Sequence, residues 1–394
     1  MAINTTYTPK TNYVVKGTQD LGERYITKSY FIDNWLNLTG VNQFGLYAWG
    51  DNSNGTYGNG TTLTRSSPIQ IASTTQWSKI ASTPQSVLAI KSSNNTLWTW
   101  GGNGQGQLGS GTTVIRSSPV QVGTLSNWKS ITGGVYNVSS IKTDGTLWTW
   151  GYNSNGQLGS GTTVSRSSPV QVGTLTNWNL VASSYYNVIA IKTDGTLWMW
   201  GSNFYGNLGL GNTIDRSSPV QVGTLTNWKI VSGGAYATSA IKTDGTLWTW
   251  GAYLLIQGTP TYYSSPVQVG TLSNWKYLAS HRDGGFATKT DGTLWAWGHN
   301  NLGQLGDGTT IDRSSPVQIG SLTNWKTVVS SYNSYNCFAI KTDGTLWAWG
   351  NNGGGYFGNG STINASSPVQ IGTLSNWISL DVSSTTIVAT NIIS

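Results

Sequence analysis

The chain has 394 residues and a formal net charge of +7, with only 9% charged residues but 51 glycines and 21 tryptophans. The tryptophans and 19 tyrosines supply ample apolar area for a packed core, which excludes low-complexity disorder. A single cysteine excludes an internal disulfide, and the positive charge is spread too thinly for a typical nucleic-acid binder.

Residues 1–41 mix apolar and charged residues without a clean period. Such a leader is typical of a docking arm that becomes ordered on a larger assembly, and wrapping around the rim of the following domain is the open alternative. The segment lacks the basic and then apolar pattern of a secretion signal, and no stretch of the chain reaches the roughly 18 apolar residues of a membrane helix. We expect synthesis in the cytoplasm and no membrane insertion.

From residue 42 onwards the tetrapeptide Trp-x-Trp-Gly recurs. A Tyr-Ala-Trp-Gly variant ends at Gly50, and the full copies end at Gly101, Gly151, Gly201, Gly251, Gly298 and Gly350. Seven copies with a period of about fifty residues indicate one small unit, repeated, that cannot bury its apolar faces alone.

Residues 117–150 show the unit as four strands. Residues 118–122 form the first, 128–132 the second and 138–142 the third. Asp144-Gly145 is a strong hairpin signal, because a type I′ turn needs positive φ at both central residues. Residues 146–150 form the fourth strand, with apolar side chains on both faces. A sheet that is apolar on both faces is expected to pack between neighbouring sheets.

The two ends of the chain explain how the array closes. Residues 367–371, 377–380 and 386–390 supply three strands, and residues 45–49 supply the missing fourth. We therefore predict an all-β, seven-bladed β-propeller of four-stranded blades over residues 42–394, closed by an N-terminal strand that completes the C-terminal blade. Closure removes the open edges that a repeated sheet would otherwise expose.

Residues 141–159 combine the Asp-Gly turn, the Trp-Gly pair and a Gly-Gln-Leu-Gly element, and these recur together. This run resembles the repeat of the regulator of chromosome condensation family, over roughly residues 42–394. The resemblance implies a seven-bladed β-propeller. The founding member is an exchange factor for a Ran-type GTPase that docks on chromatin, but its wedge insertion and basic tail have no match here, so that activity is not implied. The near-identical Thr-, Asn- and Ser-rich repeats are more similar to members encoded by bacteria and phages.

Strands that alternate in direction sort their connections onto two rims. On one rim, the turn Thr-Asp-Gly-Thr-Leu-Trp is repeated uniformly, starting at residues 143, 193, 243, 290 and 342. The other rim varies and is rich in aromatic residues: Tyr57, Tyr136, Tyr152, Tyr185, Tyr186, Phe204, Tyr205, Tyr236, Tyr253, Phe286, Tyr332, Tyr335, Tyr356 and Phe357. Diversified loops on a rigid scaffold are typical of recognition, and packing against the next blade is the alternative for each side chain.

Two further features belong to the aromatic rim. An arginine precedes Ser-Ser-Pro in most repeats, and Arg116, Arg166 and Arg216 are expected to take part in binding, unless they pair with nearby aspartates or carbonyl groups. Between the fourth and fifth blades, residues 252–257 replace the usual Asn-Gly-Gln-Leu-Gly stretch. Leu254 and Leu255, beside Tyr253, would form an exposed apolar patch for a protein contact, with repacking after a deletion as the alternative.

Groups for catalysis are scarce. The chain has two histidines, His281 and His299, which lack the spacing of a zinc site and cannot complete a catalytic triad; we expect both to be solvated loop residues. Residues 104–109 match the dinucleotide-binding pattern, but a strand rather than a helix follows, so no phosphate site is expected. We predict no metal ion, no cofactor and no enzymatic activity.

These patterns favour a non-enzymatic binding or structural module. We expect a phage virion protein, associated with the tail or a fibre, that contacts other virion proteins through residues 1–41. Its aromatic rim would contact a host-surface glycan or another virion protein. The alternative is a cytoplasmic regulator that engages a GTPase or another protein. An enzyme acting on sugars is a third hypothesis, and it lacks an evident acid–base pair.

Overall fold

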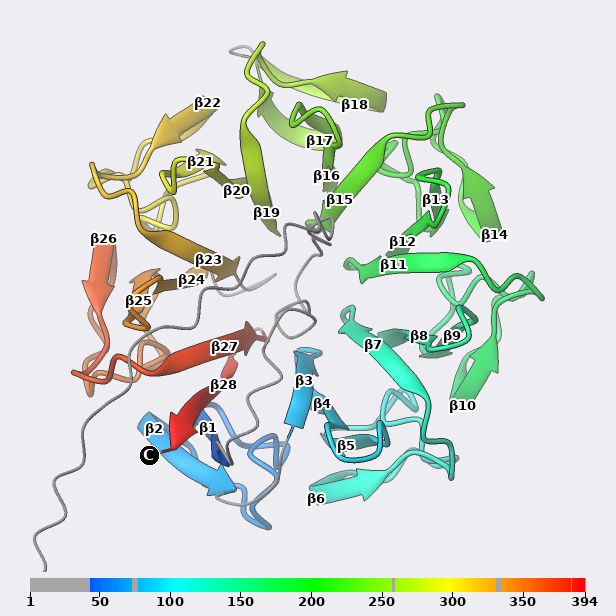
Figure 1. The fold of residues 1–394 in the computed structure, drawn as a ribbon, viewed down its shortest axis with the longest axis horizontal. Coiled ribbons are helices and arrows are strands. Elements are labelled where there is room, and N and C mark those ends of the chain that lie inside the picture. The colour runs from blue at the N-terminus through cyan, green and yellow to red at the C-terminus, as the bar shows by residue number, and fades with distance from the viewer. Residues whose placement is uncertain (1–42, 73–76, 257–258, 331–334, 384, 394) are drawn as a thin grey trace, which may run out of the picture.

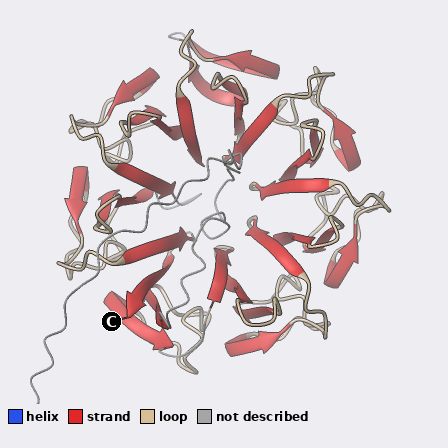
Figure 2. Ribbon diagram, in the orientation of Figure 1, coloured by secondary structure: helices blue, strands red, loops and turns tan. Residues whose placement is uncertain are grey.

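The computed structural model describes residues 43–72, 77–256, 259–330, 335–383 and 385–393. This part of the chain forms seven four-stranded antiparallel sheets that stand like blades around a common axis (Figure 1). Its secondary structure consists of strands and loops without a helix (Figure 2), so no described segment is a candidate membrane-spanning helix. The predicted all-β, seven-bladed propeller is confirmed. The predicted docking arm, residues 1–41, lies outside the described residues.

Each blade runs from an innermost strand at the centre of the ring to an outermost strand on its outer wall (Figure 1). In this order, blade 1 consists of β3 (Trp77–Ser82), β4 (Ser86–Lys91), β5 (Leu97–Gly101) and β6 (Arg116–Gln121), and blade 2 of β7 (Trp128–Gly133), β8 (Asn137–Lys142), β9 (Leu147–Gly151) and β10 (Arg166–Gln171). Blade 3 consists of β11 (Trp178–Ser183), β12 (Asn187–Lys192), β13 (Leu197–Gly201) and β14 (Arg216–Gln221), and blade 4 of β15 (Trp228–Gly233), β16 (Ala237–Lys242), β17 (Leu247–Ile256) and β18 (Thr259–Gln268). Blade 5 consists of β19 (Trp275–His281), β20 (Gly284–Lys289), β21 (Leu294–Gly298) and β22 (Arg313–Gln318), and blade 6 of β23 (Trp325–Ser330), β24 (Asn336–Lys341), β25 (Leu346–Gly350) and β26 (Ala365–Gln370). Blade 7 joins the two ends of the chain as β27 (Trp377–Val382), β28 (Thr386–Ile393), β1 (Gln43–Gly50) and β2 (Arg65–Ala72).

The ring closes through β1 and β28, which pair from Gln43 opposite Ile393 to Gly50 opposite Thr386. This confirms the predicted junction of the two chain ends. The predicted grouping of strands was wrong, because blade 7 takes two strands from each end rather than three and one. The Arg-Ser-Ser-Pro strand is the outermost strand of the blade it follows, so β26 belongs to blade 6. The short Gly-Thr-Leu segment after this strand therefore crosses between blades.

The second tryptophan of each Trp-x-Trp-Gly links neighbouring blades. Trp150 is fully buried, and its Nε1 donates a hydrogen bond of 2.9 Å to the Gln107 carbonyl oxygen in the long loop of blade 1. Equivalent bonds are donated by Trp49, Trp100, Trp200, Trp250 and Trp349. Within the described residues, Trp297 has no such acceptor, because the blade before it joins β17 to β18 as an extended hairpin. In most blades, the hydrogen bond of this tryptophan thus connects the blade to the one before it.

The first tryptophan of the motif explains why the Thr-Asp-Gly turn is uniform. Trp148 donates from Nε1 to Thr146 Oγ1 at 2.9 Å, and the Lys142 ammonium lies 3.6 Å from the centre of its ring. Burial lowers the pKa of Lys142, while the Asp144 charge partly offsets this effect. The Asp144 carboxylate accepts bonds from the Thr146 hydroxyl and amide, which lower its pKa. Each residue of the turn therefore has a structural partner.

Candidate functional site

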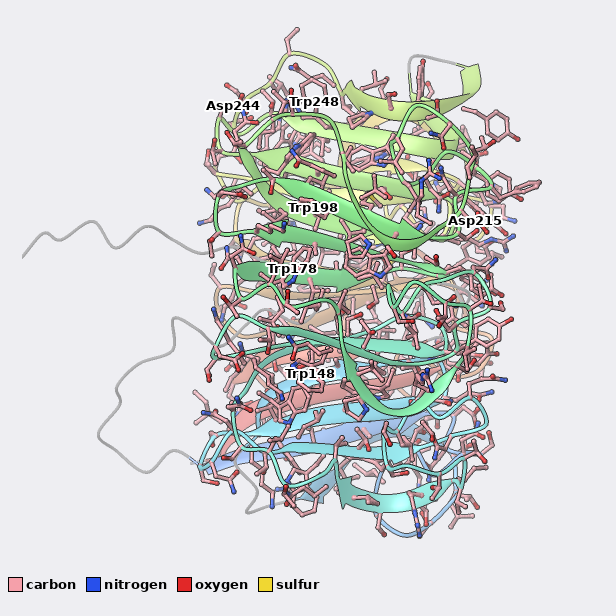
Figure 3. All side chains as sticks on the ribbon, turned by 90° about the vertical axis from the view of Figure 1, so that its right-hand side faces the viewer. Trp148, Trp178, Trp198, Asp215, Asp244 and Trp248 are labelled. Atoms are coloured by element: carbon pink, nitrogen blue, oxygen red, sulfur yellow. The ribbon has the colours of Figure 1, made fainter. Side chains whose placement is uncertain are left out.

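The connections between strands separate onto two faces of the ring. Figure 3 shows Asp244, in a Thr-Asp-Gly turn, on one face and Asp215, in a long loop, on the opposite face. We call these the turn face and the loop face. The loop face carries the connections between the first and second strands and between the third and fourth strands of each blade. The two predicted rims are confirmed, although the long loops lie within blades rather than between them.

Arg282 is the centre of the candidate site on the loop face. It occupies the turn between β19 and β20 and reaches residues of both neighbouring blades. Its Nη1 donates to the Tyr335 hydroxyl of blade 6 at 2.9 Å, and its Nη2 donates to the Tyr236 hydroxyl of blade 4 at 3.4 Å. The guanidinium carbon lies 5.5 Å and 5.8 Å from the centres of the Tyr236 and Tyr335 rings. Three blades therefore contribute to a single contact group, which we call the arginine cluster.

Charged groups surround Arg282 on the side of blade 5. Its Nε lies 3.6 Å from the Asp283 carboxylate, whose side chain is only 14% exposed. Burial raises the pKa of Asp283, and the charges of Arg282 and His299 offset part of that rise. Asp312 accepts bonds from His299 Nδ1 at 3.1 Å and from the Asn300 amide at 2.7 Å. The cluster thus presents both a cation and polar acceptors, and the Arg282 side chain is 38% exposed.

Backbone conformation contributes to the position of Tyr335. This residue has φ of +53°, a region that non-glycine side chains adopt at a cost in energy. Its ring also lies 6.2 Å from the His299 ring, in the long loop of blade 5. Contacts with Arg282 and His299 thus hold a strained residue at the edge of the arginine cluster.

His281 directly precedes Arg282 in the chain, and its predicted place in a solvated loop was wrong. It ends the innermost strand β19 and is 1% exposed. Its ring lies 5.5 Å from the Phe286 ring, and its Nε2 is 3.3 Å from the Trp297 carbonyl oxygen. Burial lowers the pKa of His281 to about 4, so the imidazole is neutral at pH 7. The other histidine, His299, is half-exposed and bonded to Asp312 rather than freely solvated.

A second group, the tyrosine arc, lies on the loop face of blades 2 and 3. The Tyr136 ring lies 6.3 Å from that of Tyr152, which in turn lies 6.4 Å from Tyr186. The Tyr185 and Tyr186 rings meet edge to face at 4.4 Å. Burial, followed by the neighbouring tyrosines, raises the pKa of Tyr186 to about 12. The Tyr186 hydroxyl therefore stays protonated at physiological pH and remains both a donor and an acceptor.

Tyr205 and Phe204 extend the arginine cluster toward blade 3. The Tyr205 ring lies 5.0 Å from Tyr236 and stacks on Tyr262 at 6.3 Å. Phe204 packs edge to face on Tyr205 at 4.9 Å, while 73% of its surface stays exposed. An exposed aromatic ring on a packed aromatic base is a typical anchor for a ligand.

The structure does not bring the other predicted residues into these groups. Arg116, Arg166 and Arg216 begin the outermost strands β6, β10 and β14, so they lie on the outer wall of the ring. The Tyr356 carbonyl oxygen accepts the indole bond of Trp49 at 2.7 Å, and the half-buried Tyr356 side chain packs against the core near the closing blade.

Corrections also apply to the aromatic rim and to the loop after blade 4. Three rings assigned to the rim are core residues with no more than 1% exposure: Tyr57, Phe286 and Phe357. The segment with Tyr253, Leu254 and Leu255 is a strand rather than a loop, since Leu254 pairs with Thr261 and Leu255 with Pro260. The side chains of these three residues, and Tyr332, lie outside the described part.

Sequence reasoning missed Arg282 and Asp283, although a signal was present. Each innermost strand begins with a tryptophan. The residue eight positions later is Tyr136, Tyr186 or Tyr236 in blades 2 to 4, but Asp283 in blade 5. A charged pair that interrupts a uniform repeat marks a position that packing alone does not require. No group of three or more metal-ligating side chains occurs among the described residues. The arrangement is suited to hydrogen bonding, stacking and charge pairing with a ligand.

Comparison with known proteins agrees with this architecture. The family model "Regulator of chromosome condensation (RCC1) repeat" matches residues 94–140, 144–191, 194–241, 291–336 and 343–389, and a second model of the same description matches residues 179–207. No curated protein matches the chain.

Solved structures show the same fold at low sequence identity. Human WBSCR16 superposes with a TM-score of 0.77 at 18% identity, over 89% of this chain and 99% of that one. Prp20p of Saccharomyces cerevisiae, described with its binding to Gsp1p and histones, gives 0.75 at 16% identity, over 90% and 93%. Yeast RCC1 (Prp20) with bound Kap60 gives 0.77 at 15% identity, over 98% and 97%. Because the repeat models match more than half of the chain, the protein belongs to the regulator of chromosome condensation (RCC1) repeat family.

Proposed function

We propose that this protein is a non-catalytic binding module that recognises its ligand with the loop face. The observation that carries the proposal is Arg282, held between the Tyr236 and Tyr335 rings of two neighbouring blades while its side chain remains 38% exposed. Arginine and tyrosine are enriched at the energetic centres of interfaces, because a pre-positioned cation and rigid rings lose little entropy on binding. The tyrosine arc extends the same kind of surface over blades 2 and 3.

We further propose that the module is part of a phage virion, associated with the tail or a fibre. Residues 1–41 would dock it on other virion proteins, and the loop face would contact a host-surface glycan. The near-identical Thr-, Asn- and Ser-rich repeats and the low share of charged residues, 9%, support this proposal. Phenolic rings and an arginine also suit a polar ligand that offers hydroxyl groups and a flat apolar side.

The test combines mass spectrometry of purified particles with a glycan array. The protein should be present in the particles, and Arg282→Gln or Tyr236→Ala should lower array binding by about tenfold, as expected for loss of an anchor residue. Arg65→Gln is the control, because it removes one exposed positive charge on the outer strand β2 without touching the cluster. Absence from particles would reject the virion role, and binding to a virion protein in place of any glycan would identify the other partner.

Family membership favours one alternative, a cytoplasmic regulator that engages a GTPase. Yeast Prp20p has the same fold and binds Gsp1p. A pull-down that returns a GTPase, together with faster nucleotide release in the presence of the purified chain, would favour this function. Arg282→Gln should then weaken that interaction while Arg65→Gln leaves it unchanged.

A further inference from the structure

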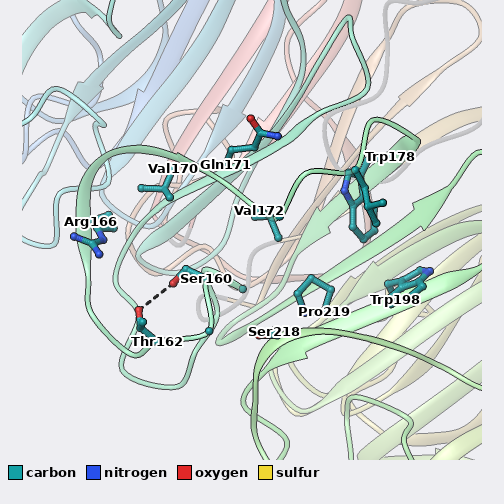
Figure 4. A pocket seen from close by; sticks show the side chains of 14 residues that line it. Ser160, Thr162, Arg166, Val170, Gln171, Val172, Trp178, Trp198, Ser218 and Pro219 are labelled. Carbon is teal, nitrogen blue, oxygen red and sulfur yellow. Dashed lines mark hydrogen bonds between the residues drawn. The ribbon is translucent and has the colours of Figure 1, made fainter.

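The outer wall of the ring contains grooves between neighbouring blades. The groove between blades 2 and 3 has a volume of about 540 Å³, and its counterpart between blades 3 and 4 about 470 Å³. Figure 4 shows the first groove, with Arg166 at one end and Trp178, Trp198 and Pro219 at the other. Trp228, Trp248 and Arg216 take the equivalent places in the second groove. The repeat has therefore produced two sites of the same chemistry, one blade apart.

Each groove ends in a buried donor without a partner. Trp178 is 2% exposed, and its Nε1 has no hydrogen-bond acceptor among the described residues. Its indole nitrogen is turned toward the groove (Figure 4). Trp228 repeats this state in the second groove with 3% exposure. The innermost tryptophans of the other blades share this state, so the buried donor is a property of the repeat and its nitrogen lies below the surface that a ligand reaches.

The arginine at the other end of the groove can pair with a ligand. Arg166 is exposed, and the residues that line its groove include no carboxylate. Blade 5 shows what the equivalent arginine binds. There, Arg313 Nε donates to the Asp307 carboxylate at 2.6 Å, and Asp307 stands six residues before the arginine, as Ser160 does before Arg166. The chain thus places a carboxylate on this arginine in blade 5, whereas the same place holds Ser160 in blade 2 and Leu210 in blade 3.

We propose that the two grooves bind an acidic saccharide chain that carries uronic acids. The ligand carboxylate would pair with Arg166 or Arg216 in the way that Asp307 pairs with Arg313. The half-exposed Trp198 and the adjacent Pro219 form an apolar wall on which the C–H face of a sugar ring can lie.

The repetition of the site favours a saccharide over an acidic peptide. A uronic-acid polymer repeats its carboxylate at a regular interval, as the groove repeats its arginine from one blade to the next. Two linked sites bind a polymer more tightly than either site alone, because the second contact forms within the complex. This site on the outer wall is separate from the arginine cluster on the loop face, so either proposal can fail without the other.

The experiment is calorimetric titration of the full chain with a galacturonate hexasaccharide and with a hyaluronan oligosaccharide. At least one should bind, and the Arg166→Gln/Arg216→Gln double variant should weaken binding by about tenfold or more. Arg313→Gln is the matched control that removes a guanidinium already paired with Asp307. Ser160→Asp should weaken binding by copying blade 5, and Asp307→Ser should strengthen it by freeing Arg313. Melting temperatures of all variants verify their folding.

Four results would overturn the proposal. These are equal binding of the methyl-esterified hexasaccharide, equal loss in Arg313→Gln and in the double variant, and absence of binding to either acidic saccharide. The fourth is preferential binding of an oligo-aspartate peptide, which would assign the grooves to an acidic protein segment.

Discussion

Replacing His281 with serine is expected to flatten the pH dependence of unfolding between pH 7 and pH 5. Burial lowers the pKa of His281 from 6.5 to about 4, so the folded protein holds the neutral imidazole while the unfolded chain takes up a proton. Stability from a group with a lowered basic pKa is present above pH 6.5 and is lost as the pH falls toward 4. Serine is a suitable replacement, because Ser184 stands at the equivalent place in blade 3.

The magnitude follows from the two pKa values. Each pH unit between them is worth about 1.4 kcal/mol, so acidification from pH 7 to pH 5 should remove about 2 kcal/mol through His281. The full loss below pH 4 would be about 3 kcal/mol. Asp283 acts in the opposite direction, because burial raises its pKa and its protonation then favours the folded state. Wild type and variant share Asp283, so the difference between their slopes isolates His281.

Guanidinium unfolding followed by far-ultraviolet circular dichroism gives the free energy of unfolding at both pH values. His281→Ser is expected to lower stability at pH 7 while it removes about 2 kcal/mol from the difference between pH 7 and pH 5. His299→Ser is the control, because it deletes a half-exposed imidazole from the same blade. Equal slopes for wild type and His281→Ser would refute the argument that the folded protein holds His281 as a neutral imidazole.

Three further predictions test the repeat itself. Trp150→Ala should lower the free energy of unfolding by about 4 kcal/mol, because it leaves a buried cavity and removes the hydrogen-bond donor of the Gln107 carbonyl oxygen. Trp148 is half-exposed, so Trp148→Ala should lower the free energy of unfolding by only about 2 kcal/mol. Chemical denaturation compares the two variants. Gly201→Ala should lower the free energy of unfolding by about 3 kcal/mol, because Gly201 has φ of +103° and an added Cβ would lie 2.4 Å from the Tyr186 carbonyl oxygen. Gly173→Ala should lower it by only about 1 kcal/mol, because no atom lies near the added Cβ. Hydrogen bonds from Thr196 lower the pKa of Asp194, so the wild-type protein loses this stability as the pH falls below 3.8. Asp194→Asn should therefore show a smaller fall in melting temperature between pH 4 and pH 2 than the wild type.

Local patterns were sufficient to predict the ring but not the grouping of its strands. Asp-Gly turns and alternating apolar residues identify strands that pair through short hairpins, and β8 and β9 form such a pair. The long loop from Gly151 to Arg166 gave no comparable signal, although β9 and β10 are neighbours in one sheet. The short Gly-Thr-Leu link looked like a hairpin turn, yet it crosses between blades. Loop length alone does not distinguish these two connections.

The arginine cluster could not be predicted because its members are far apart in sequence. Arg282 lies 46 residues after Tyr236 and 53 residues before Tyr335, close to one repeat in each direction. Repeat spacing places equivalent positions of adjacent blades near one another, so Tyr236 could have been matched with residue 283. The burial of His281 depends instead on the packing of Phe286 and Trp297 around one particular strand end. That packing has no signature in the local pattern.

At the junction between blades 4 and 5, a hydrogen bond that connects other blades is missing among the described residues, and part of the arginine cluster lies there. Among the described residues, Trp297 has no acceptor for the indole bond that connects other blades, and the preceding blade pairs β17 with β18 as an extended hairpin. The bond from Arg282 to Tyr236 crosses this same junction, and the bond to Tyr335 crosses the next one. A side chain that both joins blades and faces solvent can transmit the occupancy of the loop face to the packing of the ring. A ligand that binds Arg282 would therefore also stabilise the two junctions that these hydrogen bonds cross.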